Sequence, residues 1–218
     1  GVACNHAKTR AYCATPCPPP ADVAALGPQV WVSGPDCPAA ANGIDVVGVP
    51  VGSDAYVATH TAGRLAEERA FLDAIPEVQH PQCEWLLLRL CAEPRANHLL
   101  RTCLPSTIAA FAEARDDALW TNFCSLIRVP ASTGTEVSRF LASLPGRYGG
   151  AGLRSATRVG PAAFFGGWAS ALPVIARKWP VFAASLVAQL DAGHSDSRSL
   201  QEAITARALL EGEGWREC

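Results

Sequence analysis

The sequence has no methionine and few charged or aromatic side chains. Of its 218 residues, 17% are charged and 7% are aromatic, whereas 49% are hydrophobic. A chain of this length with so much apolar material can bury a large core, and the composition argues against wholesale disorder. No secretory signal peptide is recognisable. Because the first residue is Gly1 and Met is absent, we expect a piece of a longer protein.

The usual signatures of a self-contained active site are also missing. The sequence contains no Gly-x-Ser-x-Gly elbow and no His-Glu-x-x-His pair. The glycine-rich stretch 146–152 lacks the Lys-Ser/Thr of a phosphate-binding loop, and its glycines instead suit a tight turn and a closely docked helix. The adjacent residues Asp116 and Asp117 fall within a predicted helix, where we expect a solvated face rather than a metal site.

The net charge of −2 hides an uneven distribution. Residues 1–80 carry four Lys or Arg against eight Asp or Glu, and residues 81–218 carry fourteen against twelve. All of the basic excess lies between Arg89 and Arg158. This pattern permits a local contact with a polyanion, but it does not by itself identify a nucleic-acid-binding protein.

Nine cysteines are scattered along the chain. Four occupy apolar helix stripes, as buried free thiols do in a reducing compartment: Cys83, Cys91, Cys103 and Cys124. We therefore expect an intracellular protein, in the nucleus or the cytoplasm. A second group invites a zinc interpretation but lacks a Cys-x-x-Cys knuckle: Cys4, Cys13, Cys17 and Cys37. The sequence favours no metal site and leaves a zinc-stabilised structural domain as an alternative.

Residues 159–176 contain no charged side chain, which raises the question of a membrane span. Two prolines, three glycines and a single leucine make the segment a poor match, and its length is near the lower limit for crossing a bilayer. We expect a buried helix rich in small residues and no membrane partner.

Residues 80–105 show two amphipathic helical patterns that meet at Pro94. Proline lacks an N–H donor and disfavours helix in the residue before it, so the pattern predicts a helical hairpin. Three arginines lie outside the apolar stripes and give the hairpin a basic outer face: Arg89, Arg95 and Arg101.

Capping residues and apolar spacing predict further helices. Single helices are expected over 53–75, 105–126, 135–144 and 200–210. A pair of apolar helices is expected to start at Ser155 and to be broken at Pro173 and Pro180. Two short β-branched segments, 30–32 and 44–51, are predicted strands. The expected fold class is α+β, predominantly α-helical, with the β portion near the N-terminus.

Four stretches, in order, resemble the C-terminal half of reverse transcriptases encoded by non-LTR retrotransposons. Residues 1–9 are similar to the palm motif that follows the catalytic aspartates, with its Gly, Asn and Lys-Thr pair. Residues 43–53 resemble the primer grip, a β-hairpin that holds the primer end, with Val-Gly where the family usually has Leu-Gly. Residues 85–105 and 144–156 resemble the helical, thumb-side region.

The resemblance implies three parts: the end of a palm-like region with a primer-grip-like hairpin over 1–52, a helical thumb-like region over 53–190, and a polar C-terminal helix and tail over 191–218. It also implies a parent protein that is an RNA-directed DNA polymerase. The family's metal-binding aspartates lie before the first motif, so this chain lacks the two-metal site and is not expected to polymerise alone. Mg²⁺ is expected for the parent polymerase, and no cofactor for this chain.

The resemblance further assigns roles to individual residues. Lys8 matches the lysine that assists the pyrophosphate leaving group. The resemblance places three residues near the primer strand: Gly48, Val49 and Pro50. The three arginines of the predicted hairpin would meet backbone phosphates. The alternatives are an ordinary surface lysine for Lys8 and a solvated helix face for each arginine.

The expected partners are an RNA/DNA template–primer and the remainder of the parent polyprotein, and the expected function is to hold that template–primer. Two other functions stay open. A helical protein-interaction module without a nucleic-acid role fits the mild acidity and the many Ala and Leu residues, and a zinc-stabilised structural domain fits the cysteines. A decayed retroelement remnant without activity is a further alternative.

Overall fold

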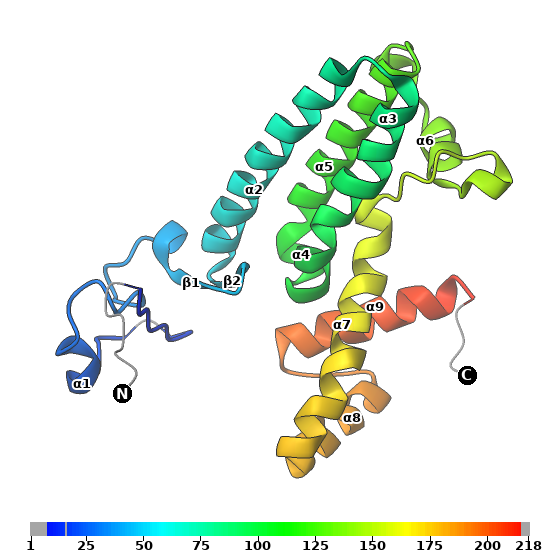
Figure 1. The fold of residues 1–218 in the computed structure, drawn as a ribbon. Helices are drawn as coiled ribbons and strands as arrows, with labels where there is room; N and C mark the ends of the chain where they lie inside the picture. Colours follow the sequence, from blue (N-terminus) through cyan, green and yellow to red (C-terminus); the bar gives the residue numbers. More distant parts are fainter. Residues whose placement is uncertain (1–7, 16, 215–218) are drawn as a thin grey trace. The chain divides into compact units, whose positions relative to one another are not determined.

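The computed structural model describes residues 8–15 and 17–214, and it confirms a predominantly α-helical α+β fold (Figure 1). The sheet found in these residues is a two-stranded antiparallel hairpin near the N-terminus. The chain forms two compact units, residues 1–64 and 65–218, and the boundary between them falls inside helix α2 (Asp54–Ala74).

In the first unit, β1 (Gly43–Val46) pairs with β2 (Val49–Gly52). The chain reverses at Val47 and Gly48, which both have positive φ angles, 56° and 79°. The Asp45 carboxylate accepts the backbone N–H of Gly48 at 2.7 Å and closes the turn. The expectation of one continuous strand here is therefore wrong, and the hairpin that the family resemblance implies is present.

The hairpin packs onto the start of α2. A Cβ at Gly43 would lie 2.3 Å from the Tyr56 ring, so glycine is needed for strand and helix to approach this closely. The Ser53 hydroxyl accepts the backbone N–H of Tyr56 at 3.1 Å, which confirms the predicted cap of the helix. His60 Nε2 lies 2.9 Å from the Asp45 carboxylate and ties the turn to the helix a second time.

The rest of the first unit has little regular structure among its described residues. It contains the short helix α1 (Ala21–Ala24) and the 3-10 turn η1 (Ala39–Ala41). The strand predicted at 30–32 is wrong, since it is reduced to an isolated bridge between Trp31 and Ala11. A pair of strands alone is only marginally stable in water. With no further strand beside it among the described residues, the predicted segment does not extend beyond this bridge.

In the second unit, residues 81–102 form one irregular helical rod instead of the predicted hairpin (Figure 1). Its consecutive parts are α3 (Pro81–Leu86), π-helical η3 (Leu87–Ala92), 3-10 helix η4 (Glu93–Ala96) and α4 (Asn97–Thr102). The residues flanking Pro94 keep right-handed helical angles. The change from π to 3-10 geometry accommodates the missing N–H, so the proline distorts the helix without ending it.

A buried ion pair joins this rod to α2 and to α5 (Pro105–Leu126). The Arg115 side chain is 1% exposed, and its Nε lies 3.0 Å from the Glu68 carboxylate. Its Nη2 donates to the carbonyl oxygens of Ala92 and Glu93, each at 2.7 Å, where the rod changes its helical geometry. Apolar core residues pack nearby: Leu72, Ile75, Leu88, Leu119 and Leu153. Ile75 begins the 3-10 helix η2 (Ile75–Val78), which ends α2 close to its predicted boundary.

The C-terminal helices are α7 (Ala156–Lys178), α8 (Pro180–Ala192) and α9 (Arg198–Gly212). The predicted break at Pro180 is confirmed, whereas the predicted break at Pro173 is wrong because α7 runs through it. Helix α7 contacts α4, α5, α8 and α9, and this packing keeps the helix continuous although the proline removes one backbone donor.

Helix α7 lies very close to α4. A Cβ at Gly167 would lie 2.4 Å from the carbonyl oxygen of Arg101, so the two backbones touch at this glycine. In length and composition α7 also meets the requirements of a membrane-crossing helix, with a mean hydropathy of 1.4 over 18 residues, of which 11% are buried. The expectation of a buried helix thus holds for only part of α7, and the absence of a membrane partner stays a prediction.

Between α5 and α7 the chain forms η5 (Ala131–Thr133), α6 (Glu136–Ser143) and η6 (Gly146–Tyr148). Thr135 caps α6 by accepting the backbone N–H of Ser138 at 3.2 Å, and Ser155 caps α7 by accepting that of Arg158 at 3.2 Å. Both helices begin where the sequence predicts their starts.

Candidate functional site

The three arginines assigned to phosphate contacts lie on one rod but against three different neighbours. The Arg89 guanidinium lies 5.4 Å from the Trp85 ring, and that of Arg95 lies 4.3 Å from the Phe71 ring of α2. Arg101 donates to the hydroxyl of Ser170 in α7 at 3.2 Å. The basic outer face predicted for a hairpin is therefore distributed around the rod.

The residues assigned to the primer strand lie in the first unit. Gly48 is exposed in the hairpin turn, Val49 is half-buried, and Pro50 is buried. Lys8 is exposed in a turn. The part of the first motif before Lys8 lies outside the described residues. The structure thus presents Gly48 and Lys8 at the surface and withdraws Pro50 from it.

A groove in the second unit lies between α5, α6 and the beginning of α7, with a volume of about 740 Å³. Its floor includes Leu119 and Trp120 of α5, and Phe140 of α6 adds an aromatic wall. Asp116 and Asp117 also line it, although the sequence pattern predicts only a solvated helix face for them.

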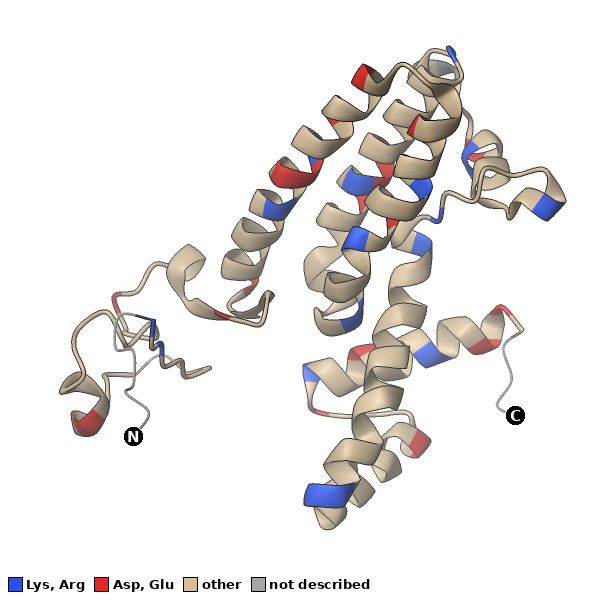
Figure 2. Ribbon diagram, viewed as in Figure 1, with Lys and Arg blue, Asp and Glu red and all other residues tan. Residues whose placement is uncertain are grey.

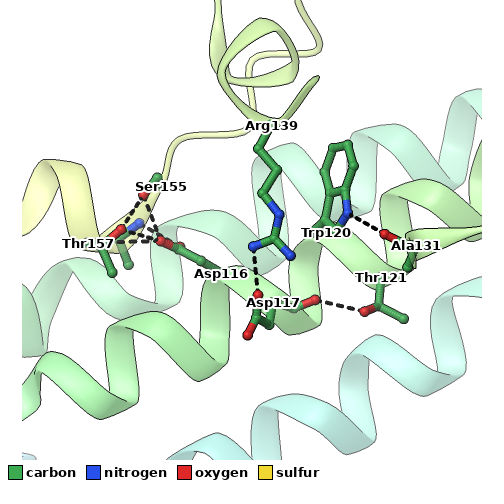
Figure 3. Close-up of polar contacts among 9 residues, drawn as sticks. Asp116, Asp117, Trp120, Thr121, Ala131, Arg139, Ser155 and Thr157 are labelled. Atoms are coloured by element: carbon green, nitrogen blue, oxygen red, sulfur yellow. Dashed lines mark hydrogen bonds and ion pairs between the residues drawn. The ribbon is translucent and has the colours of Figure 1, made fainter. Parts of the chain in front are cut away.

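Asp116 fixes the first turn of α7 (Figure 3). Its carboxylate accepts the backbone N–H groups of Ala156 at 2.7 Å and Thr157 at 3.1 Å. It also accepts the hydroxyls of Ser155 at 2.6 Å and Thr157 at 2.8 Å. A negative charge at a helix N-terminus satisfies free N–H groups and interacts favourably with the helix dipole. The predicted solvated face is therefore wrong for Asp116, which anchors α7 on α5.

Asp117 and Trp120 hold α6 against α5 (Figure 3). The Asp117 carboxylate lies 2.6 Å from Arg139 Nη1, and the Arg139 guanidinium lies 5.5 Å from the Trp120 ring. The Trp120 indole N–H donates to the carbonyl of Ala131 at 3.3 Å. Both aspartates are thus engaged by protein partners. The groove has an apolar floor, with arginines and the carboxylates of Glu113 and Glu136 also in its lining.

The four cysteines that the sequence places on apolar helix stripes fall into two pairs. Cys103 and Cys124 are buried as predicted, and burial raises the pKa of both thiols. The prediction is wrong for Cys83 and Cys91, which are exposed. Cys91 lies in the π segment, where a regular 3.6-residue period does not hold, so its position on the expected stripe turns outward. Cys83 lies in the first turn of α3, before that segment. In residues 8–15 and 17–214, no three His, Cys, Asp or Glu side chains lie together as a metal site would require.

Sequence reasoning missed the groove because its residues are far apart along the chain. Ser155 was recognisable as a helix cap, but its partner Asp116 lies 39 positions earlier. Arg139 and Asp117 are separated by 22 positions. The signal available was the acidic pair inside a helix that carries Trp120, which is compatible with many structures.

Comparison of the chain with protein-family models, with curated proteins and with solved structures finds no match. The resemblance to reverse transcriptases accordingly rests on the four motifs, and what it implies for function is a proposal.

Proposed function

We propose that the helical unit holds an RNA–DNA template–primer, as the thumb-side part of a reverse-transcriptase-like protein. One observation carries this proposal: arginines accumulate between Arg89 and Arg158 beyond what carboxylates neutralise. The segment contains nine arginines and five acidic residues. In Figure 2, blue positions lie along the rod, on α5 and in the part of the chain between α5 and α7, with red positions among them on α5.

Among residues 8–15 and 17–214, internal ion pairs account for three of these arginines. Arg115 is paired with Glu68, Arg139 with Asp117, and Arg154 with Glu93. Within the described part of the chain, the other six lie beyond ion-pair distance of any carboxylate: Arg89, Arg95, Arg101, Arg128, Arg147 and Arg158. Guanidinium groups without a carboxylate partner are available to phosphate oxygens, and such contacts supply affinity without sequence preference.

Stacking on aromatic rings suits this role. The Arg89 and Arg95 guanidinium groups lie over Trp85 and Phe71. The aromatic ring attracts the guanidinium and restrains its position, and the planar guanidinium carries its N–H donors at its edge. It can therefore donate two parallel hydrogen bonds to a phosphate with little further ordering.

The proposal assigns binding rather than chemistry to this chain. By the resemblance, RNA-directed DNA polymerisation with Mg²⁺ belongs to the parent protein, whose metal-binding aspartates precede the first motif. Lys8 would assist the leaving group there, and the hairpin turn at Gly48 would lie near the primer end. Within this chain, the arginines of the rod are the residues that contact backbone phosphates.

The proposal is tested by equilibrium binding of a blunt RNA–DNA duplex, with the fluorescence anisotropy of the labelled duplex as the readout. The triple variant R89A/R95A/R101A is expected to bind at least tenfold more weakly, since each phosphate contact contributes roughly 1 kcal/mol or more. The matched control R177A/K178A removes two charges at the end of α7, outside the 89–158 segment, and is expected to bind like the unchanged chain. Equal affinities for all three proteins would contradict the proposal.

A protein-interaction module is the second candidate, and the groove between α5 and α6 is the observation that favours it. Val137 and Phe140 are exposed on α6, and both line the groove. Such a module is expected to bind a protein with little dependence on salt and to show no affinity for the duplex. A zinc-stabilised domain is tested separately by the metal content of the protein purified without chelator.

A further inference from the structure

The segment from α6 to the loop before α7, residues 135–154, carries exposed aromatic rings beside arginines. We call it the α6 lobe. Tyr148 is 64% exposed and Phe140 is 47% exposed. The Arg147 guanidinium lies 4.8 Å from the Tyr148 ring, and that of Arg158, at the start of α7, lies 5.1 Å from the Phe140 ring. Two aromatic–cation pairs thus lie on or beside one small element.

Backbone hydrogen bonds fold the tip of the lobe back onto α6. The N–H of Ala151 donates to the carbonyl of Ala142 at 3.0 Å, and that of Gly152 donates to Leu144 at 2.9 Å. Gly149 has a φ of 80°, which glycine adopts without strain. This closed loop presents Tyr148 on a fixed backbone, and a pre-organised side chain loses less conformational entropy when it binds.

These pairs differ from Arg89–Trp85 and Arg95–Phe71 in the exposure of the ring, because Trp85 and Phe71 are half-buried whereas Tyr148 and Phe140 are exposed. An exposed ring offers a face on which an unpaired base can stack, and an adjacent arginine meets the neighbouring phosphate. Bases inside a duplex are already stacked on each other and cannot reach such a ring. Arg147 and Arg158 are both among the six arginines without a carboxylate partner, so no carboxylate competes with a phosphate for either guanidinium.

We propose that the α6 lobe binds single-stranded nucleic acid by stacking bases on Tyr148 and Phe140, with Arg147 and Arg158 on the phosphates. In the setting of the proposed function, on which this inference rests, the ligand is the single-stranded template beyond the primer–template duplex. The rod holds the duplex and the α6 lobe holds the unpaired strand.

The test compares three probes: a blunt RNA–DNA duplex, the same duplex with a single-stranded RNA extension, and that RNA strand alone. The unchanged chain is expected to bind the extended duplex more tightly than the blunt one. Y148A and F140A are each expected to weaken binding of the extended duplex and of the single strand by roughly 5- to 100-fold, and to leave the blunt duplex unaffected.

Two control variants separate stacking from other effects. Y148F keeps the ring and is expected to bind single strands like the unchanged chain. W179A removes a ring that is 60% exposed and has Lys178 Nζ 5.9 Å away, so it matches the lobe residues in exposure and charge but lies between α7 and α8. It is expected to leave single-strand binding unchanged. Quenching of a fluorescent base in the single strand reports stacking directly.

Different probes test this inference and the proposed function, so the failure of one can be told from the failure of the other. Equal affinity for blunt and extended duplexes, with no effect of Y148A on either probe or on the single strand, overturns the inference and leaves duplex holding intact. Loss of binding in Y148F as severe as in Y148A overturns stacking as the cause. Absence of blunt-duplex binding overturns the proposed function, while the single-strand probe still decides the role of the α6 lobe.

Discussion

The buried side chain of Arg115 joins three elements of the second unit. It reaches Glu68 on α2 and two carbonyls of the rod from a position on α5, and it is almost fully buried. A buried guanidinium is tolerated when a carboxylate and hydrogen-bond acceptors pair with it, because desolvating an unpaired charge costs several kcal/mol. The sequence predicts a helix at this position, but it contains no sign that this arginine points inward.

We expect Arg115→Ala to lower the free energy of unfolding by about 3 to 5 kcal/mol, because the buried Glu68 carboxylate loses its partner. Urea unfolding followed by circular dichroism measures the loss. The double variant E68Q/R115M removes both charges and is expected to recover part of it. Arg177→Ala, an exposed arginine on α7, serves as control and should change stability by less than about 0.5 kcal/mol. An Arg115→Ala protein as stable as this control would contradict a central role for the ion pair.

Asp45 makes the hairpin sensitive to acid. The hydrogen bond from the Gly48 backbone N–H holds the pKa of this carboxyl below its ordinary value. The hydrogen bond with the His60 side chain is the second cause. The folded chain therefore binds a proton less readily than the unfolded chain at this site. The stabilisation is present above the unfolded pKa of about 3.9 and is lost as pH falls through the lower, folded value.

We expect Asp45→Asn to melt at a lower temperature than the unchanged chain near neutral pH, and the difference to shrink toward strong acid. Asparagine still accepts the Gly48 N–H, so Asp45→Ala should be less stable than Asp45→Asn. Asp36→Asn changes an exposed aspartate of the same unit and is the control. Thermal unfolding across a pH series checks the expectation, which fails if the difference between Asp45→Asn and the unchanged chain is independent of pH.

At the scale of elements, α7 depends on how closely it approaches α4. Gly166 and Gly167 are neighbours in the middle of this helix, but a Cβ at Gly166 would meet nothing within 4 Å, whereas one at Gly167 would lie 2.4 Å from the Arg101 carbonyl oxygen. Both positions have helical backbone, so alanine is conformationally favourable at each. The two glycines thus separate helix propensity from packing.

We expect Gly166→Ala to stabilise the protein by up to about 1 kcal/mol through helix propensity. Gly167→Ala is expected to destabilise it by about 1 to 3 kcal/mol, because α4 and α7 must move apart to admit a methyl group. Chemical denaturation of the two variants checks both signs. Equal stability of the two proteins would show that the close contact between α4 and α7 is not required.

Helix boundaries were predictable where a local cap determines them. Ser53, Thr135 and Ser155 each accept a backbone N–H in the first turn of the helix that follows, as their positions in the sequence predict. Boundaries set by proline were less so, because tertiary contacts decide whether a proline ends a helix. Pro94 and Pro173 both lie within continuous helical segments.

At the scale of the whole molecule, the fold class followed from composition and periodicity, whereas the candidate site did not. The groove forms from α5, α6 and α7, and the Asp116 contacts that shape it join residues about forty positions apart. Local patterns carry no information about such pairings. Arg89, Arg95 and Arg101 were recognised in the sequence as candidate phosphate-binding residues. That they contact three different residues depends on the irregular helical rod, which no periodicity predicts.

The central claim is that the rod's arginines contact the phosphates of a template–primer. The salt dependence of duplex binding tests it most directly, since each phosphate contact contributes roughly 0.9 to the slope of log affinity against log salt concentration. We predict a steep negative slope for the unchanged chain and a slope shallower by about 2 to 3 for R89A/R95A/R101A. Parallel lines for the two proteins, or affinity that is independent of salt, would contradict the claim.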